Sequence, residues 1–255
     1  MKLFFRVSGK GQPLIILHGL FGSSDNWYSL SKVFAEQFQV YVVDQRNHGQ
    51  SPHDTNHDYK SLTSDLYNWI SENEIKNPII IGHSMGGKTA MNFAVKHPNL
   101  VQKLIIVDIV PKNYPVHHDS ILEGLQAIDL SSLKSRTEAD QTLSHYVNEP
   151  DVRQFLLKNL SRDQDQNFEW KINIPVLANH IEDMGAGVQF EGKYSGPTLF
   201  ILGKKSNYFQ KGDEKVIHKY FPNAELSFLD TGHWVQAEDP AAFTKTVTHF
   251  LQSTS

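Results

Sequence analysis

The chain has 255 residues, enough for one large domain or for a domain with an insertion, and its formal net charge is −4 with no dense basic block. This charge disfavours a nucleic-acid backbone as a partner, and no apolar run approaches the roughly 20 residues that span a membrane. The absence of cysteine excludes a thiol nucleophile, disulfides and thiolate metal sites. The 13 histidines show no compact metal-ligand spacing, and we expect the pair His117–His118 to be solvated. We expect no metal ion and no organic cofactor, and we expect a cytoplasmic protein because the N-terminus reads as a first strand and not as a signal peptide.

The N-terminal elements are predicted from apolar runs and the turns between them. Residues 2–7 and 14–17 are strand-like and are separated by a Ser-Gly-Lys-Gly turn, so we expect an edge hairpin that leads into a buried strand, and not a signal peptide. The glycine-containing loop 18–27 follows. A helix over 28–37 and a continuously apolar, buried strand over 40–43 then begin an alternation of strands and helices.

The loop 44–52 contains charged, histidine and glycine residues. We expect it to form a fixed, hydrogen-bonded turn close to the rim of the site. In this turn Asp44 and Arg46 are assigned structural roles. His48 and the nearby His53 are expected on the surface.

The centre of the sequence is a G-H-S-M-G motif at residues 82–86, which lies between three isoleucines at 79–81 and a helical pattern over 85–96. An amphipathic helix over 60–73 precedes this unit. A strand, a tight turn with a glycine on each side and a helix form the context of a nucleophile elbow, where a strained backbone projects a hydroxyl above the sheet edge. We therefore predict that Ser84 is a nucleophile. The alternative is a tight turn with a solvated serine.

Two backbone N–H groups are predicted to bind a negatively charged oxygen next to this serine. Met85 begins the following helix, where unpaired N–H groups and the helix dipole favour negative charge. The second N–H group comes from loop 18–27, whose glycines permit close approach of the backbone. We assign it to Leu20, with Phe21 as the nearby alternative.

A serine nucleophile needs a base and a third group that orients the base. His233 fits the base, because it follows the last predicted strand in a glycine-containing loop late in the chain. The usual position of the acid, after the strand over 198–202, holds no carboxylate. We prefer Asp108, which ends the strand after the elbow unit, and keep Asp213 as the alternative. Asp230 is expected to brace its own loop.

The pattern changes between residues 111 and 196, where helical segments follow one another without alternating strands. We expect a helical cap over 111–196 that is inserted into a core domain formed by 1–110 and 197–255; alternatively, these helices pack beside the sheet. The whole chain predicts an α/β fold with a mostly parallel central sheet and helices on both faces. The other predicted elements are helices over 119–129, 135–147 and 150–160, a strand over 198–203, a helix over 211–221, a strand over 225–229 and a helix over 240–252.

Five segments make the sequence similar to the YbfF-type esterases of the α/β-hydrolase superfamily: H-G-L-F-G-S at 18–23, D-Q-R-N-H-G at 44–49, G-H-S-M-G-G-K at 82–88, V-D-I at 107–109 and G-H-W at 232–234. The resemblance covers nearly the whole chain. It implies the α/β-hydrolase fold with a small helical cap, and an acid after the strand that follows the elbow, which favours Asp108. It also implies hydrolysis of acyl esters, with short-chain esters and acyl-coenzyme A thioesters as plausible substrates.

The predicted function is a serine hydrolase that cleaves small-molecule carboxylic esters or acyl thioesters through an acyl-enzyme on Ser84. A cofactor-free haloperoxidase or a carbon–carbon bond hydrolase would keep the same three residues, and a non-catalytic binding protein on this fold is a third class. A dehalogenase or epoxide hydrolase is disfavoured, because those enzymes need aspartate in place of the serine. The sequence leaves a monomer and a homodimer open.

Overall fold

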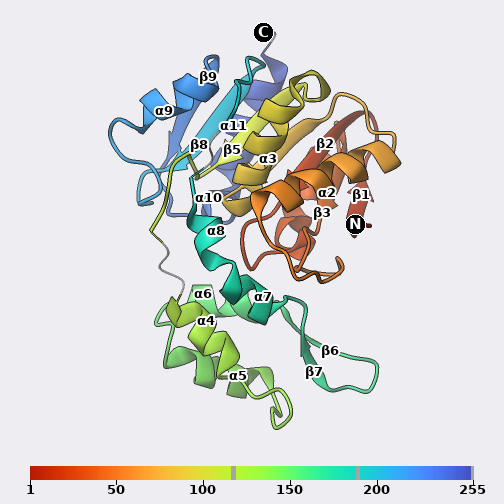
Figure 1. The fold of residues 1–255 in the computed structure, drawn as a ribbon, viewed down its shortest axis with the longest axis vertical. Helices are drawn as coiled ribbons and strands as arrows, with labels where there is room; N and C mark the ends of the chain where they lie inside the picture. The colour runs from red at the N-terminus through yellow and green to blue at the C-terminus, as the bar shows by residue number, and fades with distance from the viewer. Residues whose placement is uncertain (116–118, 188–189, 254–255) are drawn as a thin grey trace.

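Seven strands form one sheet through the middle of the molecule, in the order β1-β3-β2-β4-β5-β8-β9 (Figure 1). All neighbouring strands are parallel except β1 and β3. The computed structural model describes residues 1–115, 119–187 and 190–253, so the pair His117–His118 lies outside the described residues. The strands of the sheet are β1 Phe5–Ser8, β2 Gln12–Leu17, β3 Phe38–Val43, β4 Ile79–His83, β5 Lys103–Val107, β8 Thr198–Gly203 and β9 Ala224–Leu229.

The first strand does not pair as predicted. We expected an edge hairpin between residues 2–7 and 14–17, whereas β1 pairs antiparallel with β3. Both sides of β2 are occupied by parallel neighbours, β3 and β4. The crossover through helix α1 (Tyr28–Phe34) sets β3 beside β2, so β1 adds to the free side of β3. The hairpin prediction is wrong, because pairing between distant strands overrides proximity along the chain.

The isoleucines of β4 explain why helices cover both faces of the sheet. Ile80 packs with α2 and α3, whereas Ile79 and Ile81 pack with α1 and α11, since successive side chains of a strand point to opposite faces. This arrangement confirms the predicted fold class, and Figure 1 shows α2 and α3 in front of the sheet with α11 behind it. The first layer contains α2 Tyr59–Glu72, α3 Met85–Lys96 and α9 Asp213–Tyr220; the second contains α1, α10 Val235–Glu238 and α11 Pro240–Gln252; and two 3-10 helices span Ser24–Trp27 and Pro98–Leu100.

The chain leaves the sheet after β5 and returns at β8, and the segment in between builds a lobe that lies below the sheet in the view of Figure 1, facing the loops after β2, β4 and β9. The lobe has its own cluster of buried apolar side chains, which Phe21 joins from the loop after β2. This cluster supports our proposal of a cap over 111–196 inserted into a core of 1–110 and 197–255. None of the helices in the described part of the chain has the length and hydropathy that crossing a bilayer requires. The lobe contains α4 Asp119–Gln126, α5 Arg136–Ser144, α6 Pro150–Leu157, β6 Leu160–Arg162, β7 Phe168–Trp170, α7 Ile174–Asn179 and α8 Ile181–Gly185.

His48 supports the loop after β2, and the prediction that it lies on the surface is wrong. Its side chain is completely buried. Its Nε2 accepts a hydrogen bond of 3.1 Å from the backbone N–H of Phe21, and its Nδ1–H donates to the carbonyl of Arg46 at 2.9 Å. A histidine with both ring nitrogens bound can be buried, because neither loses a hydrogen bond on leaving water. His53 is exposed, as predicted.

The two charged residues of the same loop are held in structural interactions. The carboxylate of Asp44 accepts hydrogen bonds from the backbone N–H groups of Ser24 at 2.5 Å and Gln50 at 2.9 Å. The Arg46 guanidinium lies 2.6 Å from the carboxylate of Asp65 on α2, and both side chains are buried. These contacts fix loop 44–52 between the sheet and α2, and neither residue lines a pocket of the elbow serine.

Four histidines are buried close to the elbow and the loops around it: His18, His48, His57 and His83. Burial lowers the pKa of His18, lowers the pKa of His48 well below its ordinary value, and lowers the pKa of His57 and His83 to about 3. In the unfolded chain the same groups take up protons near pH 6.5. Protons therefore bind the unfolded chain more strongly, and the stability present above that pH is lost as the pH falls below it.

We accordingly expect the free energy of unfolding to fall between about pH 7.5 and about pH 5.5, a range above the titration of ordinary carboxylates. His57 and His83 should each account for about 1 kcal/mol of this loss. Urea unfolding curves across the range measure the loss. In His57→Gln the free energy of unfolding should depend less steeply on pH, because the contribution of His57 is removed. Identical slopes for the wild type and His57→Gln would contradict a neutral, buried His57.

Candidate active site

Ser84 lies on the sharp turn between β4 and α3. Its φ of 52° and ψ of −118° are rarely adopted by a residue with a side chain, at a cost of about 1–3 kcal/mol. A Cβ atom on Gly82 would lie 2.4 Å from the carbonyl oxygen of Gly86, and one on Gly86 would lie 2.5 Å from the carbonyl oxygens of Leu17 and His18. Only glycine fits at either position, and the helix can therefore start directly against the ends of β2 and β4.

Asp108 and His233 meet at the edge of the sheet although 125 residues separate them. His233 Nδ1 lies 2.8 Å from Asp108 Oδ2. The Asp108 carboxylate is fully buried and also accepts hydrogen bonds from the backbone N–H of Gly203, at 2.8 Å, and from the hydroxyl of Ser206. These donors hold the carboxylate, which in turn orients the imidazole with Nδ1–H toward the acid and leaves Nε2 able to accept a proton.

The other two carboxylates considered from the sequence bind elsewhere. The Asp213 carboxylate lies 2.5 Å from the ammonium of Lys112. Asp230 is largely exposed and lies 3.2 Å from the ammonium of Lys205. Of the three candidates, Asp108 alone contacts His233 in the described part of the chain.

Three side chains that the sequence analysis missed surround His233. The ring of Tyr208 stacks on the imidazole, with the centroids 4.0 Å apart and the planes at 15°. His83 Nε2 lies 2.9 Å from the carbonyl oxygen of His233. The carboxylate of Glu238 accepts hydrogen bonds, at 2.7 and 3.3 Å, from the backbone N–H groups on either side of His233. The loop after β9 is thus fixed both at its backbone and at the imidazole of His233. The sequence gives one signal for these contacts, which is the acidic Glu238 in the helical turn that follows.

Leu20 and Met85 each present a backbone N–H that has no protein acceptor among the described residues. The N–H of Phe21 points instead to His48 Nε2. The loop also approaches the elbow closely, since a Cβ atom on Gly19 would lie 3.2 Å from the Cβ of the elbow serine. This geometry favours Leu20 over Phe21 as the second donor to an oxyanion.

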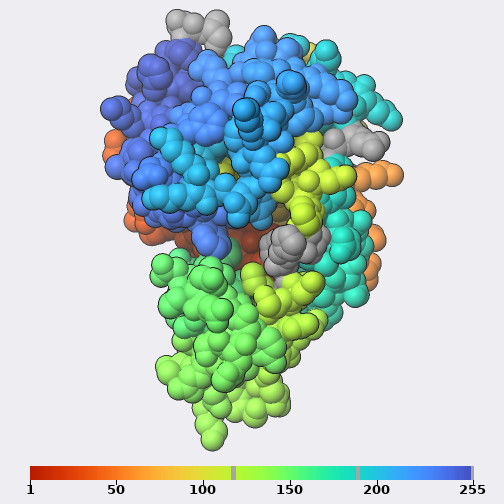
Figure 2. Space-filling view, turned by 90° about the vertical axis from the view of Figure 1, so that its left-hand side faces the viewer, coloured from red at the N-terminus to blue at the C-terminus, as the bar shows by residue number. Residues whose placement is uncertain are grey.

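Ser84 lies where two pockets meet. The larger pocket, about 670 Å³, lies between the core and the lobe and is lined by residues 18–22, His233 and side chains of the lobe such as Phe155. The smaller pocket, about 50 Å³, is lined by Leu20 and Met85 among others, but His233 does not reach it. Figure 2 shows the gap between the lobe, in green, and the blue C-terminal part, with red N-terminal residues visible at the bottom of the gap.

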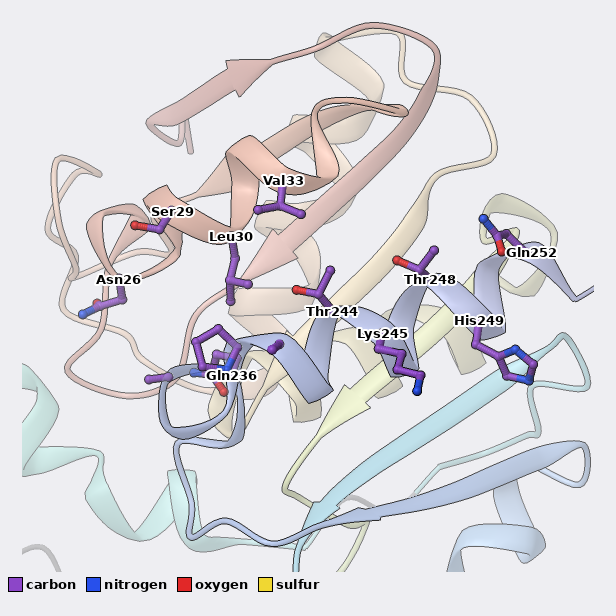
Figure 3. Close-up of a pocket in the computed structure, with 13 residues that line it drawn as sticks. Asn26, Ser29, Leu30, Val33, Gln236, Thr244, Lys245, Thr248, His249 and Gln252 are labelled. Atoms are coloured by element: carbon purple, nitrogen blue, oxygen red, sulfur yellow. The ribbon is translucent and has the colours of Figure 1, made fainter.

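A further hollow of about 940 Å³ lies between α1 and α11 (Figure 3). Its walls include the aliphatic Leu30 and Val33 and the polar Thr244 and Thr248. It contains none of the serine, aspartate and histidine described above, so its larger volume does not make it the reaction site. It adjoins the pocket of the elbow, because Gln236 lines both.

The arrangement is suited to acyl transfer. A serine hydroxyl, an imidazole oriented by a carboxylate and two unpaired N–H groups are the parts that such a reaction needs. They follow the ends of β2, β4, β5 and β9, at the sheet edge where parallel α/β folds bind ligands. Within residues 1–115, 119–187 and 190–253, no three histidine, aspartate or glutamate side chains converge as metal ligands do.

Comparisons with known proteins agree with this architecture. A family model described as the alpha/beta hydrolase fold matches residues 12–240. The sn-1-specific diacylglycerol lipase ABHD11 of Danio rerio is 38% identical over 97% of this chain and 81% of its own length, and the esterase YbfF of Escherichia coli is 33% identical over 94% of this chain and 92% of its own. The solved structure of a marine microorganism esterase has a TM-score of 0.95 and 41% identity, and the match covers 98% of this chain and 99% of that one. The predicted resemblance to YbfF-type esterases is thereby confirmed, and the chain belongs to the alpha/beta hydrolase fold family.

Proposed function

We propose that this protein is a serine hydrolase that cleaves carboxylic esters or acyl thioesters through an acyl-enzyme on Ser84. The observation that carries the proposal is the 2.8 Å contact between His233 Nδ1 and Asp108, with the imidazole lining the same pocket as the elbow serine. The lipase and esterase names of the relatives support the same reaction class.

In the proposed reaction, the Ser84 hydroxyl attacks the acyl carbonyl carbon and its proton passes to His233 Nε2. Asp108 holds the Nδ1–H and stabilises the imidazolium. The carbonyl oxygen becomes an oxyanion that accepts hydrogen bonds from the N–H groups of Leu20 and Met85, each worth about 3 kcal/mol in the transition state. His233 then protonates the leaving oxygen or sulfur, the bond to the acyl carbon breaks, and water repeats the attack on the acyl-enzyme.

The two pockets suggest how an ester lies in the site. The oxyanion donors fix the carbonyl oxygen, and the leaving atom must face His233 to receive its proton. His233 lines the larger pocket and not the smaller one. The alcohol or thiol part of the substrate therefore belongs in the larger pocket, and the acyl chain belongs in the smaller.

The smaller pocket restricts the length of the acyl chain. Its volume of about 50 Å³ accommodates roughly three to five atoms the size of water, at about 10–15 Å³ each. This space suits acyl groups from acetyl to about butyryl. The larger pocket, at about 670 Å³, leaves room for a much bulkier alcohol or thiol.

Substitution of two of the three proposed catalytic residues, Ser84 and Asp108, should lower esterase activity strongly. Ser84→Ala and Asp108→Asn should each lower kcat on p-nitrophenyl acetate by about 10³-fold or more, because the nucleophile or the orientation of its base is lost. The matched control is Asp213→Asn, which removes a carboxylate that pairs with Lys112 and should change kcat by less than about threefold.

Thermal unfolding of the same variants shows whether a loss of activity is a loss of fold. An inactive Asp213→Asn beside an active Asp108→Asn would sink the proposed acid. If the folded wild type neither cleaved esters nor reacted with a serine-directed phosphonate, the protein would be a non-catalytic member of the family. A wild type that reacts with the phosphonate but cleaves no ester would favour the carbon–carbon hydrolase or haloperoxidase alternatives.

A series of p-nitrophenyl esters tests the assignment of the pockets. We expect kcat/KM to be highest from acetate to butyrate and to fall at least about 10-fold by octanoate, because the longer chain does not fit the small pocket. Acetate esters of increasingly large alcohols should keep their kcat/KM, since the larger pocket receives the alcohol. A maximum at octanoate or beyond would instead place the acyl chain in the larger pocket.

A further inference from the structure

Lys88 lies one turn after Ser84 on α3 and has no part in the mechanism proposed above. Its side chain is almost completely buried, with 1% exposed, yet it lines the small pocket. The ammonium donates to three backbone carbonyls, those of Met184, Gly185 and Ala186, at 3.1, 3.2 and 2.7 Å. These carbonyls belong to the C-terminal end of α8, where the helix dipole is negative and four carbonyls need outside donors.

The surroundings of this ammonium are otherwise uncharged. The rings of Tyr59 and Tyr114 lie 5.4 and 5.1 Å from it, and no carboxylate among the described residues pairs with it. Burial lowers the pKa of Lys88 to about 8. A buried charge without a counter-ion is tolerated only where its donors are all bound, and here three carbonyls accept hydrogen bonds from the three N–H groups of the ammonium. The burial of the Lys88 ammonium therefore depends on the carbonyls of residues 184–186 staying in their present position.

We propose that Lys88 is a positioning residue that fixes the inner wall of the small pocket, and so limits acyl length, by tying α3 to residues 184–186. This inference rests on the proposed function, which places the acyl chain in that pocket. Met184 and Gly185 line the pocket together with Lys88 and Ser84. Because the lysine lies in the first turns of α3 and the serine caps the N-terminus of that helix, the hydrogen bonds of Lys88 set how far this wall stands from the proposed nucleophile.

Two further hydrogen bonds reach residues 184–186, the wall of the small pocket. Substitutions can therefore remove different numbers of hydrogen bonds from this wall. The hydroxyl of Tyr59 donates to the carbonyl of Met184 at 3.0 Å, and the N–H of Tyr114 donates to the carbonyl of Gly185 at 2.8 Å. Lys88 supplies three bonds to the wall and Tyr59 supplies one. Carbonyls that lose a buried donor move toward water or another partner, so removing the ammonium should shift the wall outward.

The chain contains a matched control in Lys103. Its ammonium also donates to three carbonyls at the end of a helix, those of Phe250, Leu251 and Ser253, at 3.0, 3.3 and 2.8 Å. An aromatic ring, that of Phe250, lies 5.2 Å away. This second lysine ties α11 to β5 and lines neither pocket of the elbow. Substituting it removes the same kind of contact without touching the acyl site.

The test compares Lys88→Met and Lys103→Met with the wild type on p-nitrophenyl esters from acetate to octanoate. In Lys88→Met the ratio of kcat/KM for hexanoate to that for acetate should rise at least about 10-fold, because each methylene that gains a buried place is worth about fourfold in affinity. The gain should come mainly from a lower KM for hexanoate. Lys103→Met should keep the wild-type ratio, whatever it loses in Tm. An unchanged ratio in a folded Lys88→Met would overturn the proposed control of acyl length.

Hydrogen exchange of the amides of residues 181–187 tests the tie independently of catalysis. Exchange there should be faster in Lys88→Met than in the wild type and unchanged in Lys103→Met; equal rates would overturn the tie. If Lys88→Met does not fold, Tyr59→Phe should give a smaller shift in both measurements, and no shift would count against the proposal. A wild type that cleaves no ester would refute the proposed function, and the exchange rates would still decide whether Lys88 holds the wall.

Discussion

The close approach of α3 to the carbonyl ends of β2 and β4 is the constraint on which the rest of the site depends. Gly86 touches the last carbonyl of β2, and no side chain fits between them. This contact aims the N-terminus of α3 at the pocket and forces Ser84 into its strained conformation. It also brings the loop after β2 within reach of the serine. The backbone of the elbow thus positions the proposed nucleophile and both proposed oxyanion donors before any side chain outside the turn takes part.

Two buried, neutral histidines help to hold the loops around the elbow. His48 accepts a hydrogen bond from the N–H of Phe21, and His83 forms a hydrogen bond with the carbonyl of His233. Both rings are uncharged. Because these two buried rings are uncharged, they place no additional cation near the imidazole that takes up a proton in the proposed reaction. Lys88 is a buried cation near the serine, and its ammonium is enclosed by carbonyl oxygens and aromatic rings. The two histidines therefore add hydrogen bonds to the site without adding charge.

The strands, the helices of the two layers and the elbow could be predicted because each depends on a pattern of residues that are close together in the sequence. Apolar runs of β-branched residues gave β4 and β5, and the topology of a parallel sheet then placed Asp108 near the loop of His233. The pairing of β1 with β3 and the burial of His48 could not be predicted, because they depend on partners far along the chain. The same holds for Tyr208 and Lys88. A tyrosine in a loop and a lysine in a helix look like surface residues until the segments that cover them are in place.

The order of strands has a consequence for how the site comes apart. Ser84 follows β4, the middle strand of the seven, whereas His233 follows β9, the strand at one border of the sheet. Border strands open in small fluctuations that leave the middle of a sheet intact. The proposed base thus follows a border strand and the proposed nucleophile follows the middle strand. Local unfolding at the border of the sheet would separate His233 from Ser84 and inactivate the proposed site while most of the fold persists. The hydrogen bonds from Glu238 and His83 to the loop of His233 resist this separation.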